Sequence, residues 1–348
     1  MLEFYQGKTV LITGHTGFKG SWLTKILLMS GAKVIGYSLD APTNPNLFSI
    51  LGLKKDVVSI KGDVRDLKHL KKVFEKYQPE IVFHLAAQPI VRTSYELPVY
   101  TYDVNVMGTV NVCECVRLTK SVKSFLNVTT DKVYENDDIP NHPFKEEEKL
   151  DGFDPYSNSK SCSELVTHSY IKSFFNNLNV AVSTARAGNV IGGGDFAKDR
   201  IIPDAARALK SMSVLSIRNP NSTRPYQHVL EPLYCYLLIA KEQYLGKKFC
   251  GSYNIGPDSS DFVTTETLVK LFKNNVDEFR YEIKPSNGPH EAAFLSLDNS
   301  KLKQTFKWKP HFGINKAVEL TAEWYKAWSQ NKDIVSLTEK QIKEFFNE

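Results

Sequence analysis

A glycine-rich turn between an apolar strand and an apolar helix is the feature that most restricts the fold of this 348-residue chain. The segment 10–20 reads VLITGHTGFKG, and apolar residues at helical spacing follow it. Glycines there allow a tight turn, and the free N–H groups of the helix face an anion. The turn suits a pyrophosphate, although such a turn on its own is often only a turn. The predicted contacts to the anion are Gly14, His15, Thr16, Gly17, Phe18, Lys19 and Gly20.

The next strands extend this site toward a dinucleotide. Residues 33–37 complete a β-α-β unit, and Asp40 lies about twenty residues past the turn, where an acid can bind the ribose hydroxyls of NAD. No arginine directly follows the strand, which favours NAD over NADP. Ser38 occupies the strand tip where the acid is common, so Asp40 is alternatively a plain turn residue. Further cofactor contacts are expected at the ends of two more strands, at Asp63, Val64, Leu85, Ala86 and Ala87.

The composition indicates a soluble protein of the cytoplasm. A hydrophobic share of 42% supports a large core in two domains, and no apolar run is long enough to span a membrane. The N-terminus enters the first strand without a signal sequence. The net charge of +5 is spread along helical faces, so neither nucleic acid nor a membrane is expected as a partner. Five cysteines without metal-like spacing predict reduced thiols and no metal site.

Strand and helix patterns alternate from residue 8 to about residue 186. This alternation predicts an α/β fold with a Rossmann-type, doubly wound parallel sheet. From residue 187 onward, loops rich in glycine, proline and arginine separate shorter helices, which predicts a smaller α/β C-terminal domain for the substrate. We expect an NAD-binding domain at 1–186, to which the chain returns around 229–256, and a mainly substrate-binding domain at 187–348.

Two segments carry residues suited to proton transfer. A buried strand at 125–129 delivers Thr130, Asp131 and Lys132 at its carboxyl end, the functional edge of such a sheet. Tyr156 and Lys160 are four residues apart on a helix that begins near residue 155, so they share one face. An ammonium beside a phenol lowers the pKa of the phenol, which then serves as a general base for an alcohol. A surface pair is the alternative, but the glycine turn in the same chain favours catalysis.

The segments TGHTGFKG, HLAAQP, TTDKVYEN and YSNSK resemble the extended short-chain dehydrogenase/reductase superfamily, in the branch that acts on nucleotide-linked sugars. The resemblance covers essentially the whole chain. Further segments, among them SLDAPTNPNLF, RAGNVIGGGD and RPYQHVLEP, are more similar to the 4,6-dehydratases that act on CDP-glucose than to those for dTDP-glucose or GDP-mannose or to 4-epimerases. The resemblance implies that NAD is recycled within the site, that the product is a 4-keto-6-deoxy sugar for surface polysaccharides, and that the protein is a homodimer.

The resemblance also implies roles for the residues named above. Tyr156 takes the proton of the sugar 4-hydroxyl, Thr130 bonds the 4-oxygen, and Lys160 holds the ribose and the phenolate. Asp131 protonates the departing 6-hydroxyl, because hydroxide is a poor leaving group.

The sequence offers two candidates for the base that removes the C5 proton. Relatives acting on dTDP-glucose have a glutamate where this chain has Lys132, which as a base must be neutral. Glu135 is the competing candidate, and position favours Lys132. Lys132 and His15 are also expected to add positive charge beside NAD and so to weaken its binding.

Arginines in the loops of the second half suit a diphosphate. The resemblance puts Arg224 on the diphosphate and matches Asn189 to a residue that binds the sugar phosphate. A 4-epimerase remains an alternative, although it needs no acid at C6, and a non-catalytic NAD-binding regulator would typically lack the Tyr–Lys pair. The predicted substrate contacts are Gln88, Arg92, Ser94, Asn189, Arg200, Arg218, Arg224, Tyr226 and His290.

Overall fold

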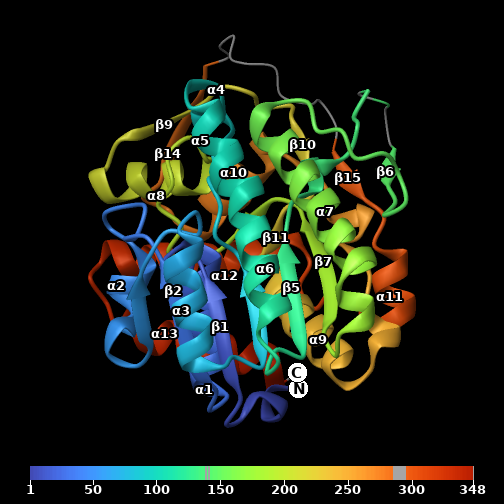
Figure 1. The fold of residues 1–348 in the computed structure, drawn as a ribbon. Helices are drawn as coiled ribbons and strands as arrows, with labels where there is room; N and C mark the ends of the chain where they lie inside the picture. Colours follow the sequence, from blue (N-terminus) through green and yellow to red (C-terminus); the bar gives the residue numbers. More distant parts are fainter. Residues whose placement is uncertain (138, 140–141, 285–294, 348) are drawn as a thin grey trace.

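A sheet of seven parallel strands forms the centre of the molecule, in the order β12-β7-β5-β4-β1-β2-β3 (Figure 1). The computed structural model describes residues 1–137, 139, 142–284 and 295–347. The Rossmann-type α/β fold expected from the sequence is confirmed. The strands are β1 (Thr9–Thr13), β2 (Lys33–Ser38), β3 (Val58–Lys61), β4 (Ile81–His84), β5 (Ser124–Val128), β7 (Ala181–Ala187) and β12 (Ser252–Ile255).

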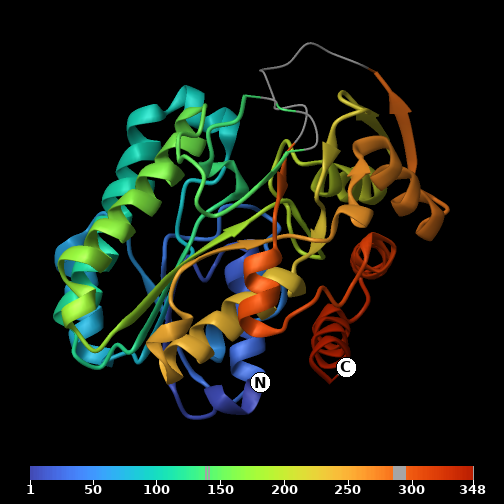
Figure 2. The same ribbon diagram turned by 90° about the vertical axis from the view of Figure 1, so that its right-hand side faces the viewer.

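Helices cover both faces of this sheet (Figure 2). Successive residues of a strand point to opposite faces, so that Val10 and Ile12 lie in one apolar core and Leu11 lies in the other. The first core is covered by α1 (Phe18–Met29) and α9 (Leu230–Leu245), and the second by α3 (Leu67–Tyr77), α6 (Gly108–Leu118) and α7 (Pro155–Ser173).

The chain after β7 builds a smaller α/β part beyond one end of the sheet, at the top of Figure 1. The β12 strand then returns the chain to the sheet, where it pairs with β7. Its larger elements are α8 (Ile201–Ser211), β9 (Val214–Ile217), α10 (Thr265–Asn275) and β14 (Arg280–Ile283). The helices α11 (Ser300–Phe306), α12 (Ile314–Ser329) and α13 (Ile334–Asn347) lie lower in Figure 1, at the level of the central sheet.

Short elements complete the structure. Four two-stranded ladders are formed by β8 (Val190–Ile191) with β11 (Gln227–His228), by β10 (Thr223–Arg224) with β13 (Val263–Thr264), by β6 (Pro143–Phe144) with β15 (Ser296–Leu297), and by β9 with β14. Short helices are α2 (Leu47–Ile50), α4 (Val91–Glu96) and α5 (Pro98–Tyr102).

The start of α7 follows from its own sequence. Asp154 is the N-cap, and its Oδ1 accepts a hydrogen bond of 3.0 Å from the Ser157 N–H. Pro155 takes the first helical position, where its missing N–H and fixed φ are tolerated. The helix therefore begins where the sequence predicts, which places Tyr156 and Lys160 in its first turns.

The predicted functional segments all follow strands at one edge of the sheet, because parallel strands share their carboxyl edge. The glycine turn follows β1, residues 85–87 follow β4, Thr130 follows β5 and Asn189 follows β7. Among the described residues, none of the helices has both the length and the apolar character that a membrane crossing needs.

Candidate active site

The backbone of the glycine turn packs closely against itself and against the chain after β4. Gly14 has a φ of +78°, which side chains rarely adopt, and a Cβ there would lie 2.8 Å from the Ala86 nitrogen. A Cβ on Gly20 would lie 2.1 Å from the Gly14 carbonyl oxygen. Gly17 is the N-cap of α1, and no side chain caps the helix there. The first N–H groups of α1 are therefore suited to an anion at the predicted place.

The end of β2 differs from the expectation for the ribose site. Asp40 is exposed, with 78% of its side chain accessible, and pairs with Lys61. At the strand tip the Thr16 hydroxyl instead contacts the Ser38 Oγ at 2.8 Å and donates to the Leu39 carbonyl at 3.1 Å. The ribose role of Asp40 stays a prediction, and Lys61 is a neighbour that the sequence did not reveal.

The predicted contacts at the neighbouring strand ends are partly engaged within the protein. The Asp63 carboxylate pairs with Arg65 at 2.7 Å. The backbone carbonyl of Asp63 accepts a hydrogen bond of 2.9 Å from the Tyr37 hydroxyl. Val64 is buried against Gly108, where a Cβ would lie 2.7 Å from its methyl group. The Ala86 N–H donates to the Thr13 hydroxyl at 3.2 Å, which holds the end of β4 beside the glycine turn.

His15 is neutral, contrary to the expectation that it adds positive charge beside the cofactor. Its ring is buried in the space that Gly36 leaves, since a Cβ there would lie 2.3 Å from the ring. Burial lowers the pKa of His15 to about 4. The Nε2 atom lies 2.8 Å from the Ser59 hydroxyl. The prediction of a charged His15 is therefore wrong at neutral pH.

The segment Thr130–Lys132, which we call the β5 tip, presents a buried carboxyl group. The Thr130 hydroxyl donates to the Asp131 Oδ1 at 2.9 Å, and Asp131 is 2% exposed. Its Oδ2 has no hydrogen-bond partner among the described residues. Burial raises the pKa of Asp131, although the neighbouring Lys132 and Arg224 act to lower it. This group is suited to donate a proton.

Lys160 lies behind the β5 tip, on α7. It is 6% exposed, and its Nζ donates to the Val128 carbonyl at 3.1 Å. Burial lowers the pKa of Lys160 to about 8, against the opposing effect of Glu164. The ammonium therefore loses its proton only as the pH rises above neutral.

Burial raises the pKa of Tyr156 to about 12, while hydrogen bonding with Thr130 lowers it. We expected the Lys160 ammonium to lower this pKa below its ordinary value, and that expectation is wrong. The physical reason is that burial disfavours the charged phenolate and that Lys160 donates to the Val128 carbonyl. Tyr156 and Lys160 do share one end of α7, as predicted.

The two candidates for the C5 base lie in different surroundings. Lys132 is half-buried and its charge acts on Asp131. Glu135 is exposed and its carboxylate lies 2.6 Å from the Lys149 Nζ. The pairing with Lys149 holds the Glu135 side chain at the surface. The geometry therefore favours Lys132 as the candidate for the C5 base.

Further cations gather around the β5 tip. The Lys19 Nζ donates to the Tyr236 hydroxyl at 3.4 Å, and burial together with Arg200 and Lys160 lowers the pKa of Lys19 to about 8. Arg200 pairs with Asp195 at 2.9 Å. The sequence predicted Lys19 only as part of the glycine turn and missed Tyr236, because no local pattern marks a contact between residues so far apart.

The predicted substrate contacts from the N-terminal half have partners within the protein. The Gln88 amide donates to the Ile90 carbonyl and to Thr101, and its oxygen accepts from the Ile90 N–H at 2.7 Å. Ser94 is fully buried and donates to the Val91 carbonyl at 2.6 Å. These side chains hold the loop after β4, and their contact with a sugar stays a prediction.

The predicted arginines lie in two places. Arg224 is buried, donates to the Thr223 carbonyl at 2.9 Å and acts on the charge of Asp131, so it faces the β5 tip. Arg92 and Arg218 both reach the Asp199 carboxylate, at 3.3 and 3.4 Å. The remaining positions are Tyr226, which is buried, Asn189, whose carbonyl accepts from the Gln227 N–H at 3.0 Å, and His290, which lies outside the described residues.

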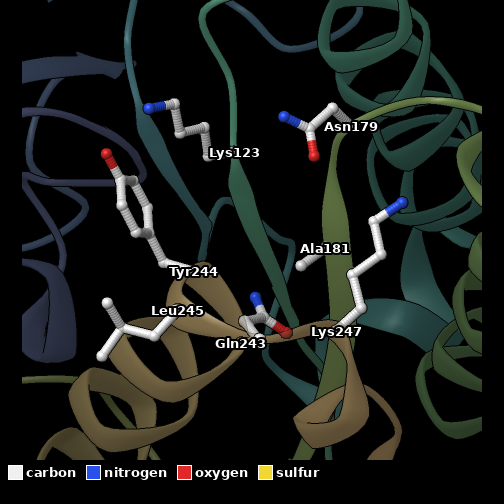
Figure 3. A pocket seen from close by; sticks show the side chains of 8 residues that line it. Lys123, Asn179, Ala181, Gln243, Tyr244, Leu245 and Lys247 are labelled. Atoms are coloured by element: carbon white, nitrogen blue, oxygen red, sulfur yellow. The ribbon is translucent and has the colours of Figure 1, made fainter.

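A cavity at the opposite edge of the sheet is separate from these residues (Figure 3). It is lined by Lys123, which precedes β5, by Ala181, which begins β7, and by the last turn of α9 with the two residues that follow it. The amino ends of parallel strands lie away from the glycine turn. Within the described part of the chain, no group of three or more histidine, cysteine or acidic side chains could hold a metal ion.

The fold and the site define a member of the extended short-chain dehydrogenase/reductase superfamily. The chain belongs to the GDP-mannose 4,6 dehydratase family, whose model matches residues 11–321.

Individual relatives are similar over most of the chain. The CDP-glucose 4,6-dehydratase of Salmonella typhimurium is 45% identical and the match covers 99% of this chain and 98% of that protein. The dTDP-D-glucose 4,6-dehydratase of Dictyostelium discoideum is 30% identical over 72% of this chain and 58% of that protein.

Solved structures share the fold. The UDP-glucose 4-epimerase of Thermotoga maritima, determined with UDP-glucose, has a TM-score of 0.80 at 22% identity and covers 92% of this chain and 99% of its own. The dTDP-glucose 4,6-dehydratase of Bacillus anthracis, in complex with NAD, has a TM-score of 0.77 at 22% identity and covers 94% of this chain and 100% of its own.

The close approach at Gly20 makes a testable prediction about stability. We expect Gly20→Ala to lower the free energy of unfolding by roughly 1–3 kcal/mol, the usual cost of overpacking, because the new Cβ would lie 2.1 Å from the Gly14 oxygen. Gly17→Ala is the control, since its Cβ would lie 3.4 Å from the same oxygen. Chemical denaturation measures both variants, and an equal loss in both would contradict the explanation.

Proposed function

We propose that this protein is an NAD-dependent CDP-glucose 4,6-dehydratase, which converts CDP-glucose to CDP-4-keto-6-deoxy-glucose and water. The observation that carries the proposal is the buried Asp131 acid at the β5 tip, on the same sheet edge as Tyr156, Lys160 and the glycine turn. The 45% identity to a CDP-glucose 4,6-dehydratase supports the choice of nucleotide.

The residues at the glycine turn fit NAD. We infer that the backbone at Gly14–Gly20 would hold the pyrophosphate, since the tight turn is possible only where Gly14 and Gly20 lack a Cβ and it leaves the first N–H groups of α1 without a side-chain cap at Gly17. Lys160 would hold the nicotinamide ribose, and Asp40, Asp63 and the residues after β4 remain the proposed contacts of the adenosine side. When bound, NAD supplies a hydride acceptor for the sugar C4 and, once reduced, a hydride donor for C6.

The first proton leaves the sugar 4-hydroxyl. The Tyr156 Oη accepts this proton, and the Thr130 hydroxyl, which hydrogen-bonds with Tyr156, holds the 4-oxygen in place. A phenol whose pKa is raised to about 12 is almost entirely protonated at neutral pH, so little of the phenolate that accepts the proton is present. The positive charge of Lys160 and of an oxidised nicotinamide would therefore have to stabilise the phenolate when cofactor and sugar are bound.

Elimination of water requires an acid and a base on the sugar. The Asp131 carboxyl, whose pKa burial raises, donates a proton to the departing 6-hydroxyl. Lys132, half-buried beside Asp131, would remove the C5 proton, which the 4-ketone makes acidic, and it can accept this proton only in its neutral amine form. Arg224, Arg200 and the two arginines on Asp199 bind the diphosphate, for which guanidinium groups are suited.

We also propose that the protein acts in the cytoplasm as a homodimer, in the synthesis of deoxysugars for surface polysaccharides. Large apolar side chains are exposed on α7 and on the neighbouring helical segment, at Leu165, Val99 and Met107. A second copy that covers these side chains would remove them from water.

The function is tested by offering the purified protein CDP-, dTDP- and UDP-glucose and GDP-mannose separately with NAD. We expect the 4-keto-6-deoxy product from CDP-glucose, with label at C4 reappearing at C6 and no free NADH accumulating. A 4-epimerised sugar without loss of water would favour the epimerase alternative. Release of one NADH per sugar would contradict the dehydratase and indicate a simple dehydrogenase.

The role of Asp131 predicts a separation of the two half-reactions. We expect Asp131→Asn to oxidise C4 and to exchange the C5 proton slowly with solvent, while formation of the 6-deoxy product falls by roughly a hundredfold, the scale for losing a general acid. Transient enzyme-bound NADH, followed by its absorbance, checks this. Equal loss of NADH formation and of product would place Asp131 in the first step or in folding.

The role of Tyr156 is tested by removing its hydroxyl. We expect Tyr156→Phe to lower turnover by roughly a hundredfold or more while the affinity for CDP-glucose is largely kept, because only the base is lost. Steady-state turnover and calorimetric binding measure the two effects. Turnover close to that of the wild type would contradict the assignment.

A further inference from the structure

Glu164 and Arg186 form an ion pair behind the β5 tip. Both side chains are fully buried, and the Arg186 Nη2 lies 2.9 Å from the Glu164 Oε2. They come from α7 and from β7, the strand that pairs with β5, and both elements lie to the same side of β5 in Figure 1. A buried ion pair is often no more stabilising than apolar side chains of the same volume, because both charges lose their hydration. Stability alone therefore does not explain this pair.

The pair bonds to both ends of the β5 tip. On the N-terminal side, the Thr129 hydroxyl donates to the Glu164 Oε1. On the C-terminal side, the Arg186 Nη1 donates to the Tyr134 hydroxyl at 2.8 Å. The four residues between these two anchors are the β5 tip, Thr130–Lys132, and Val133, so the pair fixes the segment that carries the proposed acid and base.

Tyr134 is held in one orientation. Its hydroxyl donates to the Asn254 Oδ1 at 2.6 Å, and its ring stacks on Phe144 with 4.9 Å between the centroids. The Arg186 guanidinium lies 5.1 Å from the centre of the same ring. The anchor on this side of the tip thus has little freedom to move.

The Glu164 carboxylate also acts on Lys160, one turn earlier on α7. Burial lowers the pKa of Lys160 to about 8, and Glu164 opposes this shift. The other titratable groups that face Lys160 are Lys19 from α1 and His84 from β4. Burial lowers the pKa of His84 to about 3, so it is neutral, and Lys19 is a cation. Glu164 is therefore the negative charge that keeps Lys160 protonated.

We propose that the Glu164–Arg186 pair is a positioning device for the reaction: it fixes the β5 tip against α7, and it places the Glu164 carboxylate one helical turn from Lys160. The inference rests on the proposed function, because it concerns the same proton transfers. Neither side chain touches the substrate.

The first test removes the carboxylate charge with Glu164→Gln. We expect turnover on CDP-glucose to fall by roughly ten- to hundredfold, the scale for a small displacement of reacting groups, with the KM changed less than about twofold, because the substrate contacts remain. The alkaline limb of the turnover–pH profile should move to lower pH, because Lys160 then loses its proton more easily. A merely structural role would not move this limb in the folded enzyme.

Two further variants separate position from charge. Tyr134→Phe breaks the bond from Arg186 but leaves the ion pair intact, so turnover should fall without a shift of the alkaline limb. Glu231→Gln is the matched control, since Glu231 is a buried carboxylate that accepts from the His311 and Phe312 N–H groups, away from the tip. We expect it to lower the melting temperature and to leave the pH profile unchanged.

The outcomes distinguish this inference from the proposed function. Absence of 4-keto product from wild-type protein with every sugar contradicts the proposed function. Active wild type together with a folded Glu164→Gln enzyme of unchanged turnover and pH profile overturns the positioning role. If Glu164→Gln is insoluble, Tyr134→Phe, which keeps both charges, still tests the positioning role, and a folded Tyr134→Phe enzyme with the turnover of the wild type overturns it.

Discussion

The contact between α7 and β5 is made by polar side chains, and the geometry of the site depends on it. The Asn127 amide donates to the Ser163 hydroxyl at 3.0 Å and to the Thr167 hydroxyl at 2.8 Å, while the Lys160 Nζ donates to the Val128 carbonyl. Apolar packing tolerates a helix that slides or rotates by small amounts, whereas hydrogen bonds are directional and fix one register. This register sets where the first turns of α7 stand relative to the end of β5.

Burial has the largest effect on the pKa values of the charged side chains in the site. Lys19 and Lys160 are both cations, and burial lowers the pKa of each to about 8. Arg224 faces the Asp131 carboxyl group. Burial nevertheless raises the pKa of Asp131, so loss of hydration outweighs the nearby positive charge at this position. An anionic ligand would stabilise the charged form of both lysines. Binding of a nucleotide sugar would therefore raise the pKa of both lysines, and it would be coupled to proton uptake by them.

The parts that local sequence determines were predictable. The glycine turn, the alternating faces of β1 and the start of α7 at Asp154–Pro155 each depend on residues a few positions apart. The features that the sequence missed or predicted wrongly depend on partners and burial that come from distant segments. Asp40 meets Lys61, and the charge of His15 depends on the space that Gly36 leaves on a neighbouring strand. A pattern of residue types contains neither kind of information, and the same is true of the pair between Glu164 and Arg186.

The fold does not choose between epimerisation and dehydration, since an epimerase and a dehydratase match it with TM-scores of 0.80 and 0.77. The choice depends on the β5 tip. A carboxyl group that is 2% exposed, with one oxygen unpartnered among the described residues, carries a cost of burial. Inversion at C4 alone needs no second acid. In an epimerase, no catalytic benefit would therefore offset the free-energy cost of burying Asp131. Loss of the 6-hydroxyl requires a proton donor, and Asp131 is suited to that step because burial favours its protonated form.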